Sequence, residues 1–127
     1  MKSVATVFFL LLILDGCKKP VDYRDKFLGN YTFTVHYTAY WGLPPNLGSI
    51  DTLYTYNGRV SLGSQEKAVL IYFSDKATIE PFIYEDGTWG LYSVFLGEFA
   101  STSTVKFHAS YYTAGTSSNY DVTGEKK

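Results

Sequence analysis

The chain has 127 residues, of which 46% are hydrophobic and 18% aromatic, and its 11 Lys and Arg residues nearly balance 12 Asp and Glu residues. A net charge near zero gives no reason to expect binding to nucleic acid, which requires a basic face. The single cysteine excludes an intrachain disulfide, so packing and backbone hydrogen bonds must hold the fold. Twelve tyrosines and nine phenylalanines favour β-strands, because aromatic side chains pack well on a pleated surface.

Residues 1–16 have the three-part pattern of an export signal, with a positive start, an apolar run at residues 4–14, and Gly16 before Cys17. The apolar run is shorter than the roughly 20 residues that a membrane-spanning helix needs. Residues 14–17, LDGC, resemble the bacterial lipobox, in which the signal is cut before the cysteine. Because a lone exported thiol has no partner within its chain, we expect Cys17 to carry acyl chains such as palmitate. The alternatives are an ordinary secretory signal with an unrelated cysteine, or a buried N-terminal strand or helix.

A short polar tether of residues 17–26, CKKPVDYRDK, is expected to precede a domain of residues 27–127. That length suits one domain with one core. Within it, residues 30–40, NYTFTVHYTAY, alternate strictly between apolar and more polar side chains. This period of two predicts a half-buried strand.

Turn residues divide the middle of the chain into short strands. Two prolines and two glycines make residues 41–48 a loop. Asn57 and Gly58 predict either a tight hairpin turn or a bulge in one long strand. Pro81 indicates an edge strand or a bulge. We expect strands at residues 51–56, 59–62, 67–73, 76–84 and 88–96, of which residues 67–73 are apolar on both faces and central in the sheet.

Two more strands close the chain, at residues 105–112 and 120–126, with a turn at residues 115–118 between them. No helical periodicity follows residue 16. About eight short strands joined by turns predict an all-β antiparallel meander that closes as a lipocalin-like β-barrel. The alternative is a two-sheet β-sandwich.

The two ends of the expected domain resemble a known group of proteins. Residues 22–31, DYRDKFLGNY, and residues 119–127, NYDVTGEKK, are similar to the ends of small lipoproteins found widely in Bacteroidetes bacteria. Phe27, Gly29 and Tyr31 also resemble the opening of lipocalins and fatty-acid-binding proteins. The resemblance implies a calycin-type barrel with an interior cavity, held at the bacterial cell envelope.

The same resemblance implies a location and a modification. Surface-exposed lipoproteins of these bacteria often carry an acidic run after the cysteine, whereas Lys18 and Lys19 follow Cys17 here. We therefore expect a lipid anchor in the outer membrane that faces the periplasm. Residues 51–53, DTL, match the short pattern that these bacteria use for O-glycosylation, which makes Thr52 a candidate site.

Residues suited to catalysis are sparse. The sequence contains no nucleophile elbow, phosphate loop or zinc-protease motif. His36 and His108 fall on the more polar faces of their strands, without the further cysteine or acidic spacing that a metal site needs. We therefore expect no enzymatic activity, no catalytic residue, no metal and no cofactor.

Binding fits the composition better than catalysis. Eight aromatic residues form the expected ligand-binding set: Tyr37, Tyr40, Trp41, Tyr72, Trp89, Tyr92, Phe107 and Tyr111. Such side chains hold apolar ligands, sugars or partner chains, although they also fill cores. We expect a non-catalytic envelope lipoprotein that binds a small apolar or amphipathic ligand in its barrel. The alternative is a structural or interaction lipoprotein with a filled core, which binds a protein or glycan partner on its surface.

Overall fold

The structure is a computed structural model that describes residues 19–89 and 95–127, so Cys17 and Tyr92 lie outside the described residues. Its elements are a 3-10 helix η2 (Asp25–Phe27) and eight strands: β1 (Gly29–Trp41), β2 (Gly48–Leu62), β3 (Val69–Tyr72), β4 (Thr78–Ile79), β5 (Thr88–Trp89), β6 (Phe95–Phe99), β7 (Thr104–Thr113) and β8 (Thr116–Lys126). Within the described part of the chain, no helix is both long and apolar enough to cross a bilayer.

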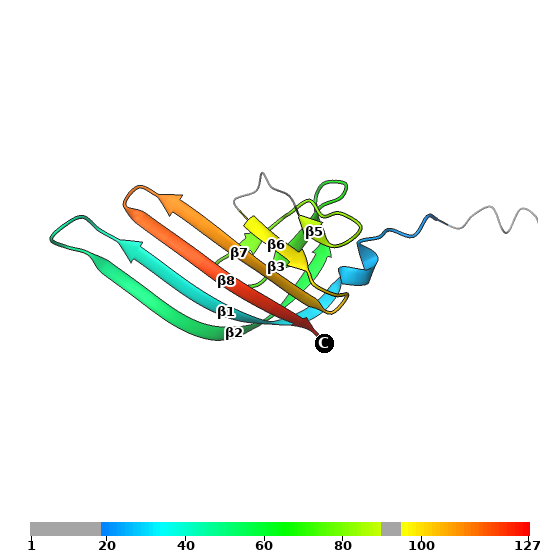
Figure 1. The fold of residues 1–127 in the computed structure, drawn as a ribbon, viewed down its shortest axis with the longest axis horizontal. Coiled ribbons are helices and arrows are strands. Elements are labelled where there is room, and N and C mark those ends of the chain that lie inside the picture. Colours follow the sequence, from blue (N-terminus) through cyan, green and yellow to red (C-terminus); the bar gives the residue numbers. More distant parts are fainter. Residues whose placement is uncertain (1–18, 90–94) are drawn as a thin grey trace, which may run out of the picture.

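All eight strands belong to one antiparallel sheet with the order β4-β3-β2-β1-β8-β7-β6-β5 (Figure 1). Neighbouring strands are consecutive in sequence, except that the first and last strands pair at the centre of the sheet. The sheet curls into a half-barrel, which confirms the all-β meander and is consistent with a lipocalin-like barrel. Because there is one sheet, the two-sheet sandwich was the wrong alternative.

Several expected assignments are wrong. The expected strand at residues 76–84 is reduced to β4 (Thr78–Ile79), and residues 67–73 lie beside this edge strand instead of at the centre of the sheet. The expected turn at residues 115–118 is misplaced, because β8 begins at Thr116.

Two further expectations fail in the long strands and near β5. The hairpin at Asn57 and Gly58 does not form, because residues 48–60 pair without interruption with residues 29–41 of β1. Gly58 is needed there for space, since a Cβ atom would meet the Phe33 ring and the Tyr72 carbonyl. Residues 88–96 do not form one strand either. Residues 88–89 belong to β5 and residues 95–96 to β6, and these two strands pair with each other.

The alternation in residues 30–40 decides which side chains enter the core. Tyr31, Phe33 and Val35 of β1 are fully buried on the concave face, while the residues between them point outward. The same period places Val105 and Phe107 of β7 in the core. The expected half-buried strand at residues 30–40 is therefore confirmed.

The half-barrel is closed at one end only, where the short strands lie. There the segment of residues 81–84 runs between β3 and β5. The Ile83 N–H donates to the Lys67 carbonyl at 2.9 Å, and the Tyr84 N–H donates to the Thr88 carbonyl at 2.9 Å. Isolated bridges join Ala68 to Phe82 and Ile83 to Trp89. Backbone pairing thus passes from β3 to β5 at this end, which we call the closed end.

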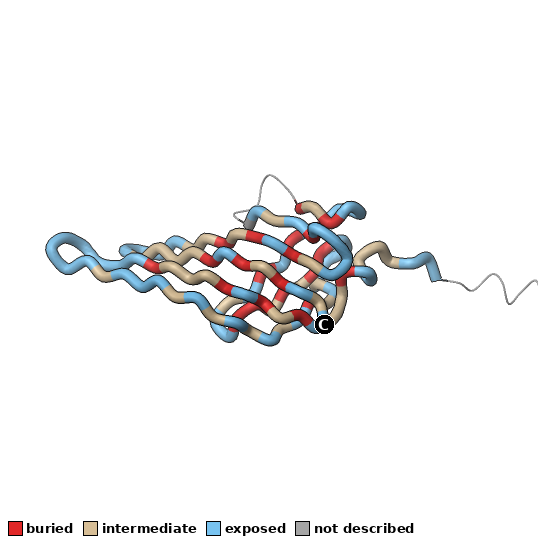
Figure 2. Tube along the Cα trace, turned by 60° about the horizontal axis from the view of Figure 1, so that its bottom comes forward, coloured by how far each residue is buried: buried red, intermediate tan, exposed pale blue. Residues whose placement is uncertain are grey.

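Aromatic rings fill the closed end. Phe27 stacks on Phe99 with centroids 4.4 Å apart, and Trp89 meets Phe99 and Phe107 edge-on or tilted. Figure 2 shows buried residues gathered around the short strands and exposed residues at the tips of the long hairpins. These hairpins, β1–β2 and β7–β8, extend past the short strands and leave the other end open (Figure 1).

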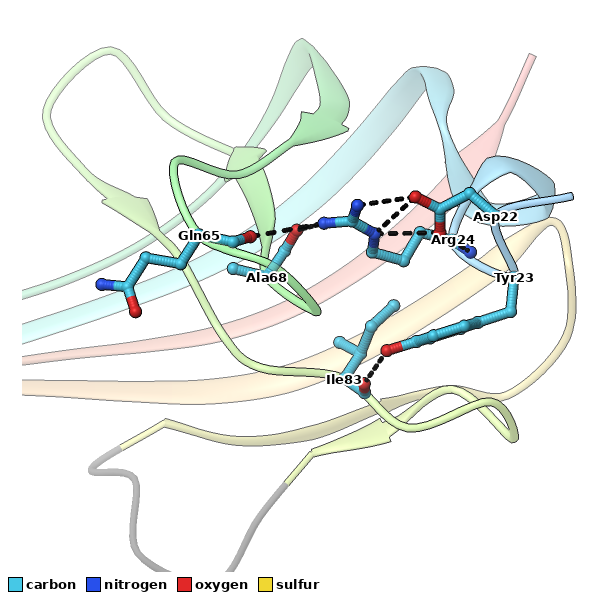
Figure 3. Close-up of polar contacts among 6 residues, drawn as sticks. All are labelled: Asp22, Tyr23, Arg24, Gln65, Ala68 and Ile83. Carbon is cyan, nitrogen blue, oxygen red and sulfur yellow. Dashed lines mark hydrogen bonds and ion pairs between the residues drawn. The ribbon is translucent and has the colours of Figure 1, made fainter. Parts of the chain in front are cut away.

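The chain before η2 is fastened to the closed end (Figure 3). The Tyr23 hydroxyl donates to the Ile83 carbonyl at 2.8 Å, and Arg24 Nη1 donates to the Ala68 carbonyl at 2.8 Å. The Arg24 guanidinium also pairs with the Asp22 carboxylate, and these hydrogen bonds hold the pKa of Asp22 below its usual value. We call Asp22, Tyr23 and Arg24 the N-terminal clamp.

Replacing Arg24 with Ala should lower the free energy of unfolding by about 2 kcal/mol, because it removes charge-assisted hydrogen bonds between the clamp and residues 65–68. Urea unfolding followed by tryptophan fluorescence measures the change. Lys106→Ala is the control, since Lys106 is an exposed cation on the outer face of β7. Equal stability of the two variants would contradict a structural role for the clamp.

Candidate functional site

The concave face has a recess of about 310 Å³ toward the open end of the half-barrel. We call it the mouth recess. Its wall combines aromatic rings, hydroxyl groups and one charge of each sign, from Tyr37, Ile50, Thr52, Tyr54, Asp75, Lys76 and Tyr120. The recess therefore offers both flat apolar surface and polar groups to a small molecule.

The strand register assembles this wall. Tyr37 of β1 lies opposite Thr52 of β2 and, on its other side, opposite Tyr120 of β8. Since residues directly opposite in a sheet share a face, these three side chains form one row across the concave surface. Tyr54 lies two residues from Thr52 and so faces the same way. The turn after β3 brings Asp75 and Lys76 to the edge of this row.

Ring packing and hydrogen bonds hold the wall in place. The Tyr37 and Tyr120 rings are 4.8 Å apart, and Tyr111 meets Tyr120 edge-on at 5.8 Å. The Tyr54 hydroxyl lies 3.0 Å from Ser74 Oγ, and Ser74 Oγ in turn donates to the Asp75 carboxylate at 3.3 Å. The recess is thus largely formed in advance of any ligand.

The phenols of Tyr120 in the wall and of Tyr111 beside it remain protonated well above neutral pH. Burial raises the pKa of Tyr120 to about 12, with added repulsion from neighbouring phenolates and Asp75. Burial also raises the pKa of Tyr111. A neutral phenol both donates and accepts hydrogen bonds, so these residues suit hydroxyl or amide groups of a ligand.

Four of the expected ligand-binding residues lie around or inside the concave face, but not together, and a fifth lies on the outer face. Tyr37 lines the mouth recess, and Tyr111 packs beside it while donating to the Thr78 carbonyl at 3.3 Å. Trp89 and Phe107 are buried core residues instead of surface for a ligand. Tyr72 was expected inside the barrel, but it points outward, with the Arg59 guanidinium 4.6 Å from its ring centroid.

The remaining three expected residues lie away from the recess or outside the described chain. Tyr40 and Trp41 lie at the open tip of the β1–β2 hairpin, with Trp41 packed over Gly48. Tyr92 is outside the described residues.

Sequence reasoning missed five residues of the wall: Ile50, Tyr54, Asp75, Lys76 and Tyr120. A signal for Tyr54 was present, because the spacing of two from Thr52 puts both on one face. Tyr120 and Tyr37 are far apart in sequence, and only the β1–β8 register brings them together.

Thr52, the expected O-glycosylation site, also lines the mouth recess. A glycan on its hydroxyl would occupy this volume. Glycosylation and ligand binding at Thr52 are therefore mutually exclusive uses of the same surface.

The two histidines lie on the convex face and do not meet. His36 Nε2 is 2.8 Å from Asp51, while His108 Nδ1 is 2.7 Å from Asp121 on a different strand pair. They border an open, shallow groove of about 660 Å³. Within residues 19–89 and 95–127, no three His, Cys, Asp or Glu side chains are grouped so that they could hold a metal ion.

Comparisons of the chain with known proteins identify no relative. No protein-family model matches the sequence, and neither the curated proteins nor the solved structures give a match.

The free energy of unfolding should fall as pH rises from about 10 to about 12. Unfolded tyrosines lose their protons above pH about 10, whereas Tyr31 and Tyr120 keep theirs to about 12 because they are buried. The folded state then binds more protons than the unfolded state, so stability decreases by up to about 1.4 kcal/mol per pH unit for each group.

Urea unfolding at a series of alkaline pH values measures this slope. Tyr120→Phe should make it shallower, because one of the two groups whose pKa is raised to about 12 is gone. Tyr112→Phe, which changes an exposed ring, controls for the loss of a tyrosine. An unchanged slope in Tyr120→Phe would show that Tyr120 does not titrate as its burial requires.

Proposed function

We propose that this protein is a non-catalytic lipoprotein of the bacterial cell envelope, which binds a small amphipathic molecule in the mouth recess. The observation that carries the proposal is the row of Thr52, Tyr37 and Tyr120 on the concave face, next to Asp75 and Lys76. Aromatic faces favour contact with an apolar or sugar-like ring, while phenols and the two charges fix polar substituents.

The size of the recess limits the ligand. About 310 Å³ lies at the lower end of the range of small-molecule sites, which is roughly 300 to 1,000 Å³. Among the described residues, the buried rings of Phe33, Phe73 and Phe107 occupy the core beyond the recess. A compact molecule with one flat apolar face fits this space better than a long acyl chain.

Native mass spectrometry on residues 18–127, purified from a bacterial periplasm without detergent, tests the proposal. We expect an excess over the denatured mass that gives the mass of the bound molecule. Thr52→Trp should abolish the excess by filling the recess. Thr55→Trp, on the opposite face of the same strand, should retain it. Equal native and denatured masses, unchanged when amphipathic compounds are added, would refute ligand binding.

A second function, interaction with a protein or glycan partner on the surface, is favoured by the apolar tip of the β1–β2 hairpin. Leu43 is 77% exposed and Leu47 is 70% exposed, beside Tyr40 and Trp41. An exposed apolar cluster of this kind marks interaction surfaces in soluble domains. If no small molecule is bound, this surface is the better guide to function.

The lipid anchor is the part of the proposal that rests on Cys17. The lipobox-like residues 14–17 and the lack of any second cysteine support acylation there. Stable attachment follows from two or more acyl chains, since each buried methylene contributes about 0.8 kcal/mol.

Replacing Cys17 with Ala in the full-length chain should abolish incorporation of labelled palmitate, because the acceptor thiol is lost. Labelling in cells followed by gel analysis measures this. Lys19→Ala is the matched control and should label like the parent chain. Labelling that survives Cys17→Ala would refute acylation at this residue.

A further inference from the structure

Strand β2 has a long edge that no other strand covers. β1 pairs with residues 48–60 along one side of β2, but β3 pairs only with residues 59–62 along the other. Residues 48–58 therefore form an edge segment, which we call the β2 edge. Among the described residues, no backbone group donates to or accepts from this side of residues 49–57.

The direction of the backbone groups follows from the alternation of an antiparallel ladder. The Gly63 N–H donates to the Ala68 carbonyl on the β3 side, so odd-numbered residues of β2 point their N–H and C=O groups that way. The Asn30 carbonyl accepts a hydrogen bond from the Lys127 N–H on the β8 side, so even-numbered residues of β1 direct their backbone groups toward β8 and odd-numbered residues direct theirs toward β2. These odd-numbered residues lie opposite even-numbered residues of β2, which leaves the odd-numbered residues of β2 directed away from β1. Both observations agree. The groups that the edge presents come from Ser49, Asp51, Leu53, Thr55 and Asn57.

The β2 edge lacks the features that keep most edges from pairing. Natural edge strands are protected by lysine, proline, bulges or short length. Residues 48–58 contain neither lysine nor proline, and their register with β1 runs without a bulge. By contrast, among the described residues β6 leaves unpaired only residue 104 and residues 110–113 of β7. The β2 edge is thus the long template for strand addition in the described sheet.

We propose that the β2 edge pairs with the β2 edge of a second copy of this chain, antiparallel and with Leu53 on the two-fold axis. In this register Leu53 lies opposite Leu53, Asp51 opposite Thr55, and Ser49 opposite Asn57. Every N–H and C=O group that the edge presents then finds a partner. An axis at residue 52 would leave Asn57 without a strand partner, and an axis at residue 54 would leave Ser49 without one. The register centred on Leu53 is therefore preferred.

The side chains also suit this register. Leu53 is 69% exposed on the convex face of the single copy, and pairing covers it with its own counterpart. On the concave face Ile50 lies opposite the partner's Tyr56, and Thr52 opposite the partner's Tyr54. Aromatic and β-branched pairs of this kind stabilise antiparallel strands. Asp51 is the only charged residue of the edge, and it faces Thr55 instead of another charge.

Pairing would also change the mouth recess, although the dimer does not depend on ligand binding. Ile50, Thr52 and Tyr54 line the recess from the β2 side. The partner copy would continue this wall with its own tyrosines. The recess is then extended by the second copy.

Residues 18–127 contain every strand of the sheet and no cysteine, so they allow a direct test. Sedimentation velocity over micromolar to submillimolar concentrations should give twice the mass of one chain. Thr55→Pro should give the single mass, because it removes an N–H that only the partner accepts and proline is tolerated at an edge. Thr55→Ala should stay dimeric, and circular dichroism should show that Thr55→Pro is folded.

Cysteine pairs test the register. Leu53→Cys should form a disulfide with itself under mild oxidation, since residues that face each other in such a ladder have Cα atoms about 5.5 Å apart. Asp51→Cys mixed with Thr55→Cys should crosslink several-fold more than either alone.

A parent chain that stays a monomer throughout would overturn the proposal. So would a dimer that survives Thr55→Pro and gives no Leu53→Cys disulfide, since such a dimer uses another surface.

Discussion

Unequal strand length is the constraint on which the rest of this structure depends. A sheet closes only where every neighbouring pair of strands has residues to pair. β3, β4 and β5 span four, two and two residues, whereas β1 and β2 span 13 and 15. Closure is therefore confined to the end where the short strands lie, with residues 81–84 completing the backbone pairing.

The difference in strand length also separates a closed end with a packed core from an open end whose concave face is accessible. Where the sheet wraps around fully, side chains meet from all sides, and stacked rings such as Phe27 and Phe99 leave no polar atom to satisfy. Where only the long hairpins continue, the concave face loses its opposite wall. Tyrosine serves there better than phenylalanine, because its ring packs on the sheet while its hydroxyl reaches water or a hydrogen-bond partner. Tyr37 and Tyr54 follow this rule, as each hydroxyl lies near a serine.

The architecture could be predicted from sequence because it follows from local alternation. Residues 30–40 and 105–112 have a clear period of two, and both are strands with the expected buried faces. The hairpin predicted at Asn57 and Gly58 was wrong, because continuous pairing of this segment with β1 outweighs the local turn preference of the two residues. Tyr72 misled because residues 67–73 are apolar on both faces, so alternation gives no inside or outside. The mouth recess could not be predicted as a unit, because it depends on the registers of three strands and one turn.

The N-terminal clamp at the closed end would set the orientation of a membrane-anchored copy. A single copy tethered through Cys17 would stand on its closed end. Its open end would then lie about 40 Å further out, since β1 has 13 residues at roughly 3.3 Å each. Such a molecule would take a ligand from the aqueous phase and not from the lipid beneath it. Two copies joined antiparallel through β2 would carry their tethers at opposite ends, so the strands would run along the bilayer plane. Self-association would thereby change the direction of the strands from perpendicular to parallel to the membrane, and it would bring the recess close to the lipid headgroups.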